Sequence, residues 1–263
     1  MKNLWDHKLA SRLKKNPLLL RVYSSQLLGL DSDLVLHGGG NTSVKINETN
    51  IFGEEEEILY VKGSGRNLAT IDKVDFTPLR LAHMKKLVEL IDISDTMLVR
   101  EQQLAMTLPE APRPSVESLL HAIIPFSWID HTHADAVVTL TNTPKGKKLI
   151  KNIYGDSFLI IPYVMPGFKL ARTVYEITKK VDWQQYEGMI LLNHGIISFG
   201  TEAHESYKRM INAVTLAEKY LKKFSSMPKN NFKKTVPVQK QETLRKLARI
   251  RKKVSIIRGS ASL

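Results

Sequence analysis

Two histidines separated by one residue, His131 and His133, are the residues of this chain best suited to chemistry. They lie in Asp130-His-Thr-His-Ala-Asp135, which follows the apolar run 123–129 and is expected to form a strand. Residues two apart in a strand point to the same face, about 7 Å apart along the backbone. The pattern therefore predicts two imidazoles that can share one divalent metal.

A third histidine, His194, lies in the predicted turn Leu192-Asn-His-Gly-Ile196. The glycine that follows it favours a tight reversal, which would present the imidazole at the end of a strand. A histidine in a turn is by itself usually structural or solvated. Three imidazoles, however, form a common zinc-binding set that leaves a position for a carboxylate, water or substrate.

Glu117 is the leading candidate for the carboxylate. Ser115 is expected to cap a helix, and this would place Glu117 at the third helical position, near free amides and the positive end of the helix dipole. A glutamate at that position can equally be a capping residue that contacts only its own helix. His121 shares the same helix face and is interpreted as a packing residue or an alternate ligand. Asp130 and Asp135 are interpreted as residues that support the ligands from behind.

Two glycine-rich segments, Gly38-Gly-Gly-Asn-Thr-Ser43 and Lys62-Gly-Ser-Gly-Arg66, indicate an anion-binding site. Glycines let backbone N–H groups converge on a phosphate, and Asn, Ser and Thr add neutral donors. Neither segment has the spacing of a Walker loop or of a dinucleotide-binding motif, which disfavours a nucleotide-binding fold. Glycine-rich turns without a ligand remain the alternative. Lys45 and Lys62 are interpreted as electrostatic or solvated residues, not nucleophiles.

These candidates require a sheet with helices on its faces to position them. Five or six strand-like runs, including 44–46 and 58–61, alternate with helical patterns. Helices are expected over residues 9–30, interrupted or entered at Pro17, from Thr77-Pro78 onward, and over residues 202–224. The alternation predicts an α/β or α+β class.

The composition restricts the chemistry. The chain has 263 residues and no cysteine, so any metal must be held by histidine and carboxylate. The net charge is +13, but residues 224–263 carry eleven basic residues against one acid, whereas residues 1–223 carry 28 against 25. The nearly neutral body disfavours a nucleic-acid partner, and the tail is interpreted as a solvated charge run rather than a membrane anchor. Without a long apolar stretch or a signal-peptide pattern, we expect a cytoplasmic protein with no membrane partner.

Five motifs, in order, resemble the class II aldolase/adducin family over residues 18–221. The motifs are Gly-Gly-Asn-Thr-Ser-Val at 39–44, Lys-Gly-Ser-Gly at 62–65, Pro-Ser-Val-Glu at 114–117, His-Thr-His-Ala-Asp at 131–135 and Asn-His-Gly at 193–195. The resemblance implies a mixed α/β domain of three α/β/α layers with a central, largely antiparallel sheet, which we place at residues 1–224, followed by a basic extension at 225–263. It also implies a homo-oligomer, commonly a tetramer, with sites at subunit boundaries.

The resemblance further implies roles for individual residues. The histidines at 131, 133 and 194 would bind one zinc ion, or another divalent metal, per chain. Glu117 would be the acid/base and a further ligand before the substrate arrives. The residues that would hold a substrate phosphate are Asn41, Thr42, Ser64, Gly65 and Ser115. Ser-Val-Glu replaces the usual Ser-Ser-Glu, so one hydroxyl donor is absent. The family's aldolases also use a tyrosine from a neighbouring subunit as proton donor, and Tyr154 lies at a compatible distance along the chain.

The motifs look closest to the aldolase half of bifunctional rhamnulose-1-phosphate aldolase/short-chain dehydrogenase proteins. That likeness implies zinc-dependent cleavage of a ketose 1-phosphate, of the rhamnulose or fuculose type, to dihydroxyacetone phosphate and an aldehyde such as lactaldehyde. The same fold also supports a pentulose-5-phosphate epimerase, a decarboxylase or a non-catalytic adducin-like binding module. The retained histidines and Glu117 favour an enzyme. In the tail, a possible helix face is formed by Leu244, Leu247, Ile250 and Val254.

Overall fold

The computed structural model describes residues 1–225, 246, 248–250 and 252–253. The chain divides into two compact units, Met1–Leu221 and Lys222–Leu263, and every site residue predicted from the sequence lies in the first. No helix among the described residues is long and apolar enough to cross a membrane. Three residues of the helix face predicted in the tail, Leu244, Leu247 and Val254, lie outside the described residues.

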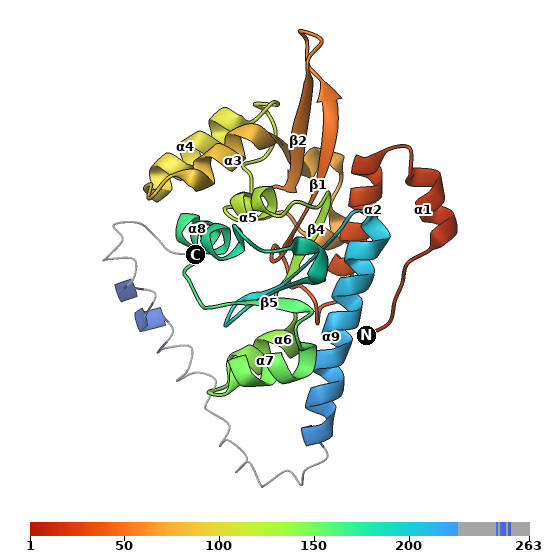
Figure 1. The fold of residues 1–263 in the computed structure, drawn as a ribbon, viewed down its shortest axis with the longest axis vertical. Coiled ribbons are helices and arrows are strands. Elements are labelled where there is room, and N and C mark those ends of the chain that lie inside the picture. The colour runs from red at the N-terminus through yellow and green to blue at the C-terminus, as the bar shows by residue number, and fades with distance from the viewer. Residues whose placement is uncertain (226–245, 247, 251, 254–263) are drawn as a thin grey trace. The chain divides into compact units, whose positions relative to one another are not determined.

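A seven-stranded sheet forms the centre of the first unit (Figure 1). The strands are β1 (Asn41–Thr49), β2 (Glu55–Lys62), β3 (Phe76–Arg80), β4 (Trp128–Thr132), β5 (Phe158–Ile161), β6 (Gly188–Leu191) and β7 (Gly195–Gly200). Their order is β3-β2-β1-β4-β7-β6-β5, and all neighbours are antiparallel except β5 and β6. The predicted largely antiparallel central sheet is confirmed.

Helices cover both faces of this sheet and complete the three layers (Figure 1). They are α1 (His7–Leu13), α2 (Pro17–Gly29), α3 (Leu81–Glu89), α4 (Asp95–Ala105), α5 (Ser118–Ile123), α6 (Asp135–Thr141), α7 (Gly146–Tyr154), α8 (Phe168–Thr178) and α9 (Ala203–Ser225). Because side chains alternate along a strand, Met189 and Leu191 of β6 join the hydrophobic core beneath α3, α5 and α8. Ile190, between them, joins the core beneath α2, α6, α7 and α9.

The helix expected over residues 9–30 is two helices, α1 and α2. The side chain of Asn16 accepts a hydrogen bond from the Leu19 N–H, and Pro17 occupies the first helical position, where its missing N–H costs nothing. A new helix therefore begins at Pro17.

The helix expected to begin at Thr77-Pro78 was predicted wrongly, because this segment forms strand β3. Pro78 lies opposite Tyr60 of β2, and β3 is the edge strand of the sheet. A proline is tolerated there because its missing N–H faces away from the only partner strand. The helix α3 begins directly after the strand, at Leu81.

A buried ion pair joins α2 to strand β4. Arg21 Nη2 lies 2.6 Å from Asp130 Oδ1, and both side chains are buried. The Ser206 hydroxyl of α9 donates to the other Asp130 oxygen. Asp130 was expected to support the metal ligands from behind, but it points to the opposite face of β4 from His131 and holds the helices against the sheet instead.

Candidate metal centre

Four predicted residues, Glu117, His131, His133 and His194, come together, and one ligand atom of each lies within 4.8 Å of the others. The ring centroids of the three histidines are separated by 4.9, 5.0 and 5.0 Å. The rings therefore form a nearly equilateral triangle with a carboxylate beside it. This is the donor set that divalent zinc sites use.

Pairing of β4 with β7 brings the histidines together. His131 lies in β4 opposite Ile197 of β7, and His133 follows one residue after β4 ends. His194 lies in the turn between β6 and β7. The side chain of Asn193, which has a positive φ of 58°, donates to Asn142 Oδ1 at 2.8 Å and so anchors this turn.

Gly195 has a different role from the one expected. The positive φ of the turn belongs to Asn193, and Gly195 already lies in β7. A Cβ atom on Gly195 would lie 2.4 Å from the Thr132 carbonyl oxygen and 3.1 Å from the rings of both His131 and His133. The glycine is therefore needed for the close approach of the two imidazoles.

Glu117 begins a helix, whereas the sequence placed it at the third helical position. It is the N-cap residue of α5, and its side chain makes no capping hydrogen bond. Pro114 still bridges Gly63, and the Ser115 N–H donates to the Lys62 carbonyl oxygen, so the chain remains extended up to Ser115. The Ser115 hydroxyl still accepts from the Glu117 N–H, but the turn that Ser115 begins comes before α5, and Glu117 is the N-cap. Both helix-capping interpretations of Glu117 are wrong, and its carboxylate is free to face the histidines.

The hydrogen bonds of His131 determine which nitrogen can bind a metal. Nδ1 lies 3.0 Å from the Ile196 carbonyl oxygen, which can only accept, so Nδ1 carries the proton and Nε2 carries a lone pair. That Nε2 atom lies 3.1 Å from His133 Nε2 and 3.4 Å from Glu117 Oε2. Burial lowers the pKa of His131 to about 3, so the ring is neutral at physiological pH, as metal binding requires.

The carboxylate of Glu117 is ionised despite its burial. Burial raises the pKa of Glu117, but the neighbouring His131 and His194 rings and the Asn41 amide outweigh it, and the pKa lies well below its usual range. Glu117 Oε1 lies 3.1 Å from His194 Nε2, and among the described residues Glu117 Oε1 and His194 Nδ1 are buried side-chain atoms without a hydrogen bond. A cation fits here, because it would give Oε1 the partner that a buried anionic oxygen needs.

Asn41 and Ser115 contact Glu117. Asn41 Nδ2 lies 2.7 Å from Glu117 Oε2 and 3.3 Å from the Ser115 hydroxyl, which in turn accepts from the Glu117 N–H. His121 is fully buried against Asn41 and Ser43 and is not among the four clustered ligands. In this arrangement it is therefore not an alternate ligand.

The two glycine-rich segments meet beside these residues. A Cβ atom on Gly38 would lie 3.0 Å from the Gly65 carbonyl oxygen, and the Ser64 N–H donates to the Arg113 carbonyl oxygen at 2.7 Å. Ser64 and Gly65 are exposed, and Gly65 has a positive φ of 75°. The segments form a loop cluster, the anion cradle, consisting of residues 38–41, 63–66 and 113–115.

Lys62, interpreted from the sequence as an electrostatic or solvated residue, is buried and contacts this cradle. Its ammonium group donates to the carbonyl oxygens of Gly38 at 2.9 Å and Arg66 at 2.7 Å, and the residue is only 2% exposed. Burial lowers the pKa of Lys62 to about 8, while Glu117 and Asp75 act in the opposite direction. The signal was available, since a lysine ends the apolar run of β2 immediately before Gly-Ser-Gly.

Two predicted residues are not brought to the centre. The Thr42 hydroxyl pairs with Ser25 of α2 at 2.8 Å, because Thr42 points to the opposite face of β1 from Asn41. Tyr154 is 6% exposed, and its hydroxyl donates to the Ala213 carbonyl oxygen at 2.9 Å. A phenol held in the core of its own subunit is not available to a neighbouring subunit's site.

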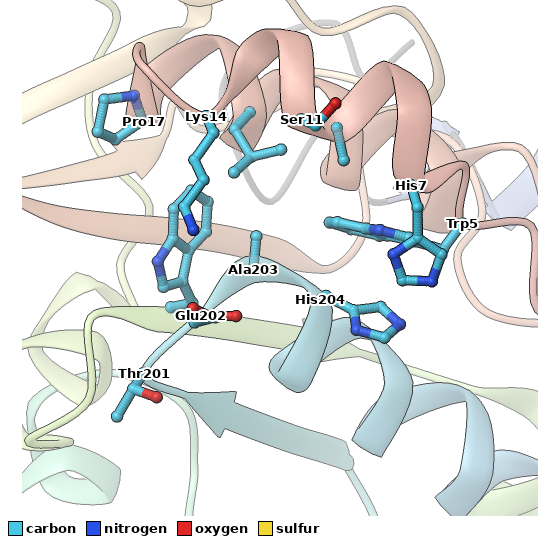
Figure 2. Close-up of a pocket in the computed structure, with 12 residues that line it drawn as sticks. Trp5, His7, Ser11, Lys14, Pro17, Thr201, Glu202, Ala203 and His204 are labelled. Carbon is cyan, nitrogen blue, oxygen red and sulfur yellow. The ribbon is translucent and has the colours of Figure 1, made fainter.

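A cavity of about 520 Å³ lies elsewhere, between the α1–α2 hairpin and the start of α9 (Figure 2). Trp5, His7, Glu202 and His204 line it, together with Trp128 from the start of β4. None of the four clustered ligands lines this cavity.

Comparisons with known proteins agree with the fold. The family described as Class II Aldolase and Adducin N-terminal domain matches residues 21–221. A protein of Bacillus subtilis (strain 168), named uncharacterized oxidoreductase YuxG, is 35% identical over 221 residues. The match covers 84% of this chain but only 32% of the relative, so the chain spans about a third of that protein's length.

Two solved structures are similar. The N-terminal class II aldolase domain of a conserved protein from Thermoplasma acidophilum has 39% identity and a TM-score of 0.74, covering 84% of this chain and 99% of that one. A sugar-phosphate aldolase from Thermotoga maritima has a TM-score of 0.59 at 16% identity, covering 81% and 96% of the two chains. At that identity the second likeness concerns the fold alone.

Proposed function

The chain belongs to the class II aldolase and adducin family, and from this premise we propose that it is a metal-dependent aldolase. The proposed reaction is cleavage of a ketose 1-phosphate, of the rhamnulose or fuculose type, to dihydroxyacetone phosphate and an aldehyde such as lactaldehyde. The observation that carries the proposal is the convergence of three imidazoles and the Glu117 carboxylate beside the anion cradle.

His131, His133 and His194 are the proposed metal ligands, for one Zn²⁺ or another divalent ion per chain, and Glu117 is a further proposed ligand before the substrate arrives. When bound, the metal supplies Lewis acidity at the carbonyl oxygen of the substrate. Glu117 is the proposed acid/base, since its ionised carboxylate can accept a proton from the carbon skeleton and return it. Asn41 holds that carboxylate in place through the 2.7 Å hydrogen bond.

The anion cradle is the proposed phosphate site. Lys62 contributes a buried positive charge whose described contacts are two carbonyl oxygens and no carboxylate. The N–H group of Gly65 has no acceptor among the described residues, and Ser64 and Ser115 add hydroxyl groups nearby. The lysine can compensate for the hydroxyl donor that is missing at Val116, because a charge-assisted hydrogen bond is stronger than a neutral one.

Metal content and product formation test the proposal separately. Purified protein should hold close to one divalent ion per chain, and the double variant His131→Ala/His133→Ala should lose it. His83→Ala is the control, because His83 pairs with Glu101 outside the cluster. Unchanged metal content in the double variant would refute the ligand assignment.

Activity is measured with rhamnulose 1-phosphate, fuculose 1-phosphate and ribulose 5-phosphate while dihydroxyacetone phosphate release is followed. Release from one of the ketose 1-phosphates supports the aldolase. Conversion of ribulose 5-phosphate to its epimer would identify the epimerase alternative. Absence of any conversion by metal-loaded protein would refute the aldolase and favour a decarboxylase or a binding module.

A further inference from the structure

Glu117 is the first of four buried side chains that lead away from the metal centre. Asn41 donates from Nδ2 to Glu117 Oε2 at 2.7 Å, and Asn41 Oδ1 faces His121 Nε2. His121 Nδ1 faces the Ser43 hydroxyl at 2.7 Å. Ser43 and His121 are fully buried, while Asn41 and Glu117 are 4% and 7% exposed. Water therefore has little access to these hydrogen bonds.

The four side chains come from two elements, strand β1 and helix α5. Asn41 and Ser43 are two residues apart on β1 and so share a face, and His121 lies on α5 four residues after its N-cap, Glu117. Three side-chain hydrogen bonds thus join the strand to the helix: Asn41 to Glu117, Asn41 to His121 and Ser43 to His121. A shift of either element changes the position of the Glu117 carboxylate.

The direction of each hydrogen bond follows from the chemistry of its groups. An ionised carboxylate only accepts, so the NH₂ group of Asn41 must face Glu117 and its carbonyl oxygen must face His121. The amide carbonyl also only accepts, so Nε2 of His121 carries the proton. The lone pair on Nδ1 then accepts from the Ser43 hydroxyl. Burial lowers the pKa of His121 to about 3, in keeping with a neutral ring.

We propose that His121 is a positioning residue for Glu117: as the Nε2–H tautomer it fixes the orientation of the Asn41 amide, which holds the carboxylate at the metal centre. If the amide flipped, its carbonyl oxygen would face the carboxylate, and two acceptors would repel each other. The inference rests on the proposed function in that Glu117 is taken as a ligand and acid/base. His121 acts through Asn41 and does not itself belong to the ligand cluster.

The tautomer can be observed directly in the intact protein. Histidine ring nitrogens labelled with ¹⁵N report whether Nδ1 or Nε2 is protonated, and His121→Gln identifies the resonances. We expect the Nε2–H form of His121 at neutral pH, both in zinc-loaded protein and after chelation. Observation of the Nδ1–H form would overturn the proposal.

Two variants separate positioning from packing. Glutamine at position 121 can supply an N–H donor to Asn41, whereas methionine has a similar size and no donor. We expect His121→Met to weaken Co²⁺ binding about 10–100-fold, as is typical for partners that orient metal ligands, and His121→Gln to restore most of the affinity. The thermal unfolding midpoints of the two variants provide the folding control. Equal Co²⁺ affinities in the two variants would show that His121 only packs.

The kinetic readout is the split between kcat and KM for the ketose 1-phosphate that the wild-type protein cleaves. His121→Met should lower kcat more than it raises KM, because Lys62 and Ser64 of the proposed phosphate site are not among the described hydrogen-bond partners of His121. If the wild-type protein cleaves none of the sugar phosphates, the proposed function fails. The tautomer and the Co²⁺ affinities then still decide whether His121 positions Glu117.

Discussion

Nε2 of His131 lies 3.1 Å from Nε2 of His133, and the Ile196 carbonyl oxygen fixes the proton of His131 on the opposite side of its ring. The nitrogen that faces His133 therefore carries a lone pair. His131 is buried and His133 is exposed, and their two Nε2 atoms can face each other either through one N–H proton of a neutral His133 or with a cation between them. Burial lowers the pKa of both rings, which favours the neutral imidazoles that a divalent cation binds.

Replacement of Gly195 by alanine tests how much metal binding depends on the close approach of the His131 and His133 rings. The new Cβ atom would contact the Thr132 carbonyl oxygen and both rings, so one ring must move. We expect the affinity for Zn²⁺, measured by competition with a chromophoric chelator, to fall about tenfold or more.

Gly53→Ala is the control, since Gly53 has a positive φ of 83° and a Cβ atom built there has nothing within 4 Å. It should cost about 1 kcal/mol of stability and leave Zn²⁺ affinity unchanged. Wild-type affinity in Gly195→Ala would contradict the prediction.

Removal of the Lys62 charge should weaken anion binding. A hydrogen bond to a charged group contributes about 1.5–3 kcal/mol, so Lys62→Met should bind inorganic phosphate about tenfold more weakly or worse, as measured by calorimetry. Lys45→Met is a matched control, because Lys45 is also buried but donates to the Ile124 carbonyl oxygen, outside the cradle. Equal phosphate affinity in the two variants would remove Lys62 from the phosphate site.

Tyr154→Phe should affect stability and not turnover. The variant loses the hydrogen bond to Ala213, which we expect to lower the free energy of unfolding by about 1 kcal/mol in urea. Burial raises the pKa of the Tyr154 phenol, which makes it a poorer acid still. A large loss of kcat without a loss of stability would instead return Tyr154 to the site.

The stability of the metal-free protein should decrease as the pH falls below about 6.5. An unfolded histidine takes up a proton near pH 6.5, whereas burial holds the pKa of His121 and of His131 at about 3 in the folded protein. Between these values only the unfolded state is protonated, so the free energy of unfolding falls by about 1.4 kcal/mol per pH unit for each such ring. His121→Gln should reduce this slope by one ring's share. The measurement is a series of urea unfolding curves in chelator from pH 4.5 to 7.5. If His121→Gln left the pH dependence of the free energy of unfolding unchanged, His121 would not be a buried neutral histidine.

The pairing of His131 with His133 on one face could be predicted from sequence, because the alternation of side chains along an extended chain is a local property. His194 could not be placed from local pattern alone, since its approach depends on the pairing of β4 with β7. Its assignment came from the order of the motifs. The predicted helix start at Ser115 was displaced to Glu117 for a related reason: the long-range bridge between Gly63 and Pro114 keeps the chain extended up to Ser115.

The positions of three side chains, those of Thr42, Tyr154 and Lys62, likewise depend on tertiary contacts that the local sequence does not reveal. Motif position placed Thr42 beside Asn41, but the strand turns neighbouring side chains to opposite faces. The distance along the chain suggested that Tyr154 could serve a neighbouring subunit's site, but its phenol is packed in the core. The position of Lys62 at the end of an apolar run was a signal in the sequence, but the two carbonyl oxygens that accept from its ammonium group, and so explain its burial, come from the loops at Gly38 and Arg66.

Strand β1 serves a different network on each face. Asn41 and Ser43 reach the metal centre and His121, while Thr42 pairs with Ser25 on the other side. A deletion or insertion of one residue before Asn41 would turn each of these side chains to the wrong face. Over evolutionary time this segment can therefore exchange residues but not change length, whereas the exposed turn at 50–54 is free to grow or shrink.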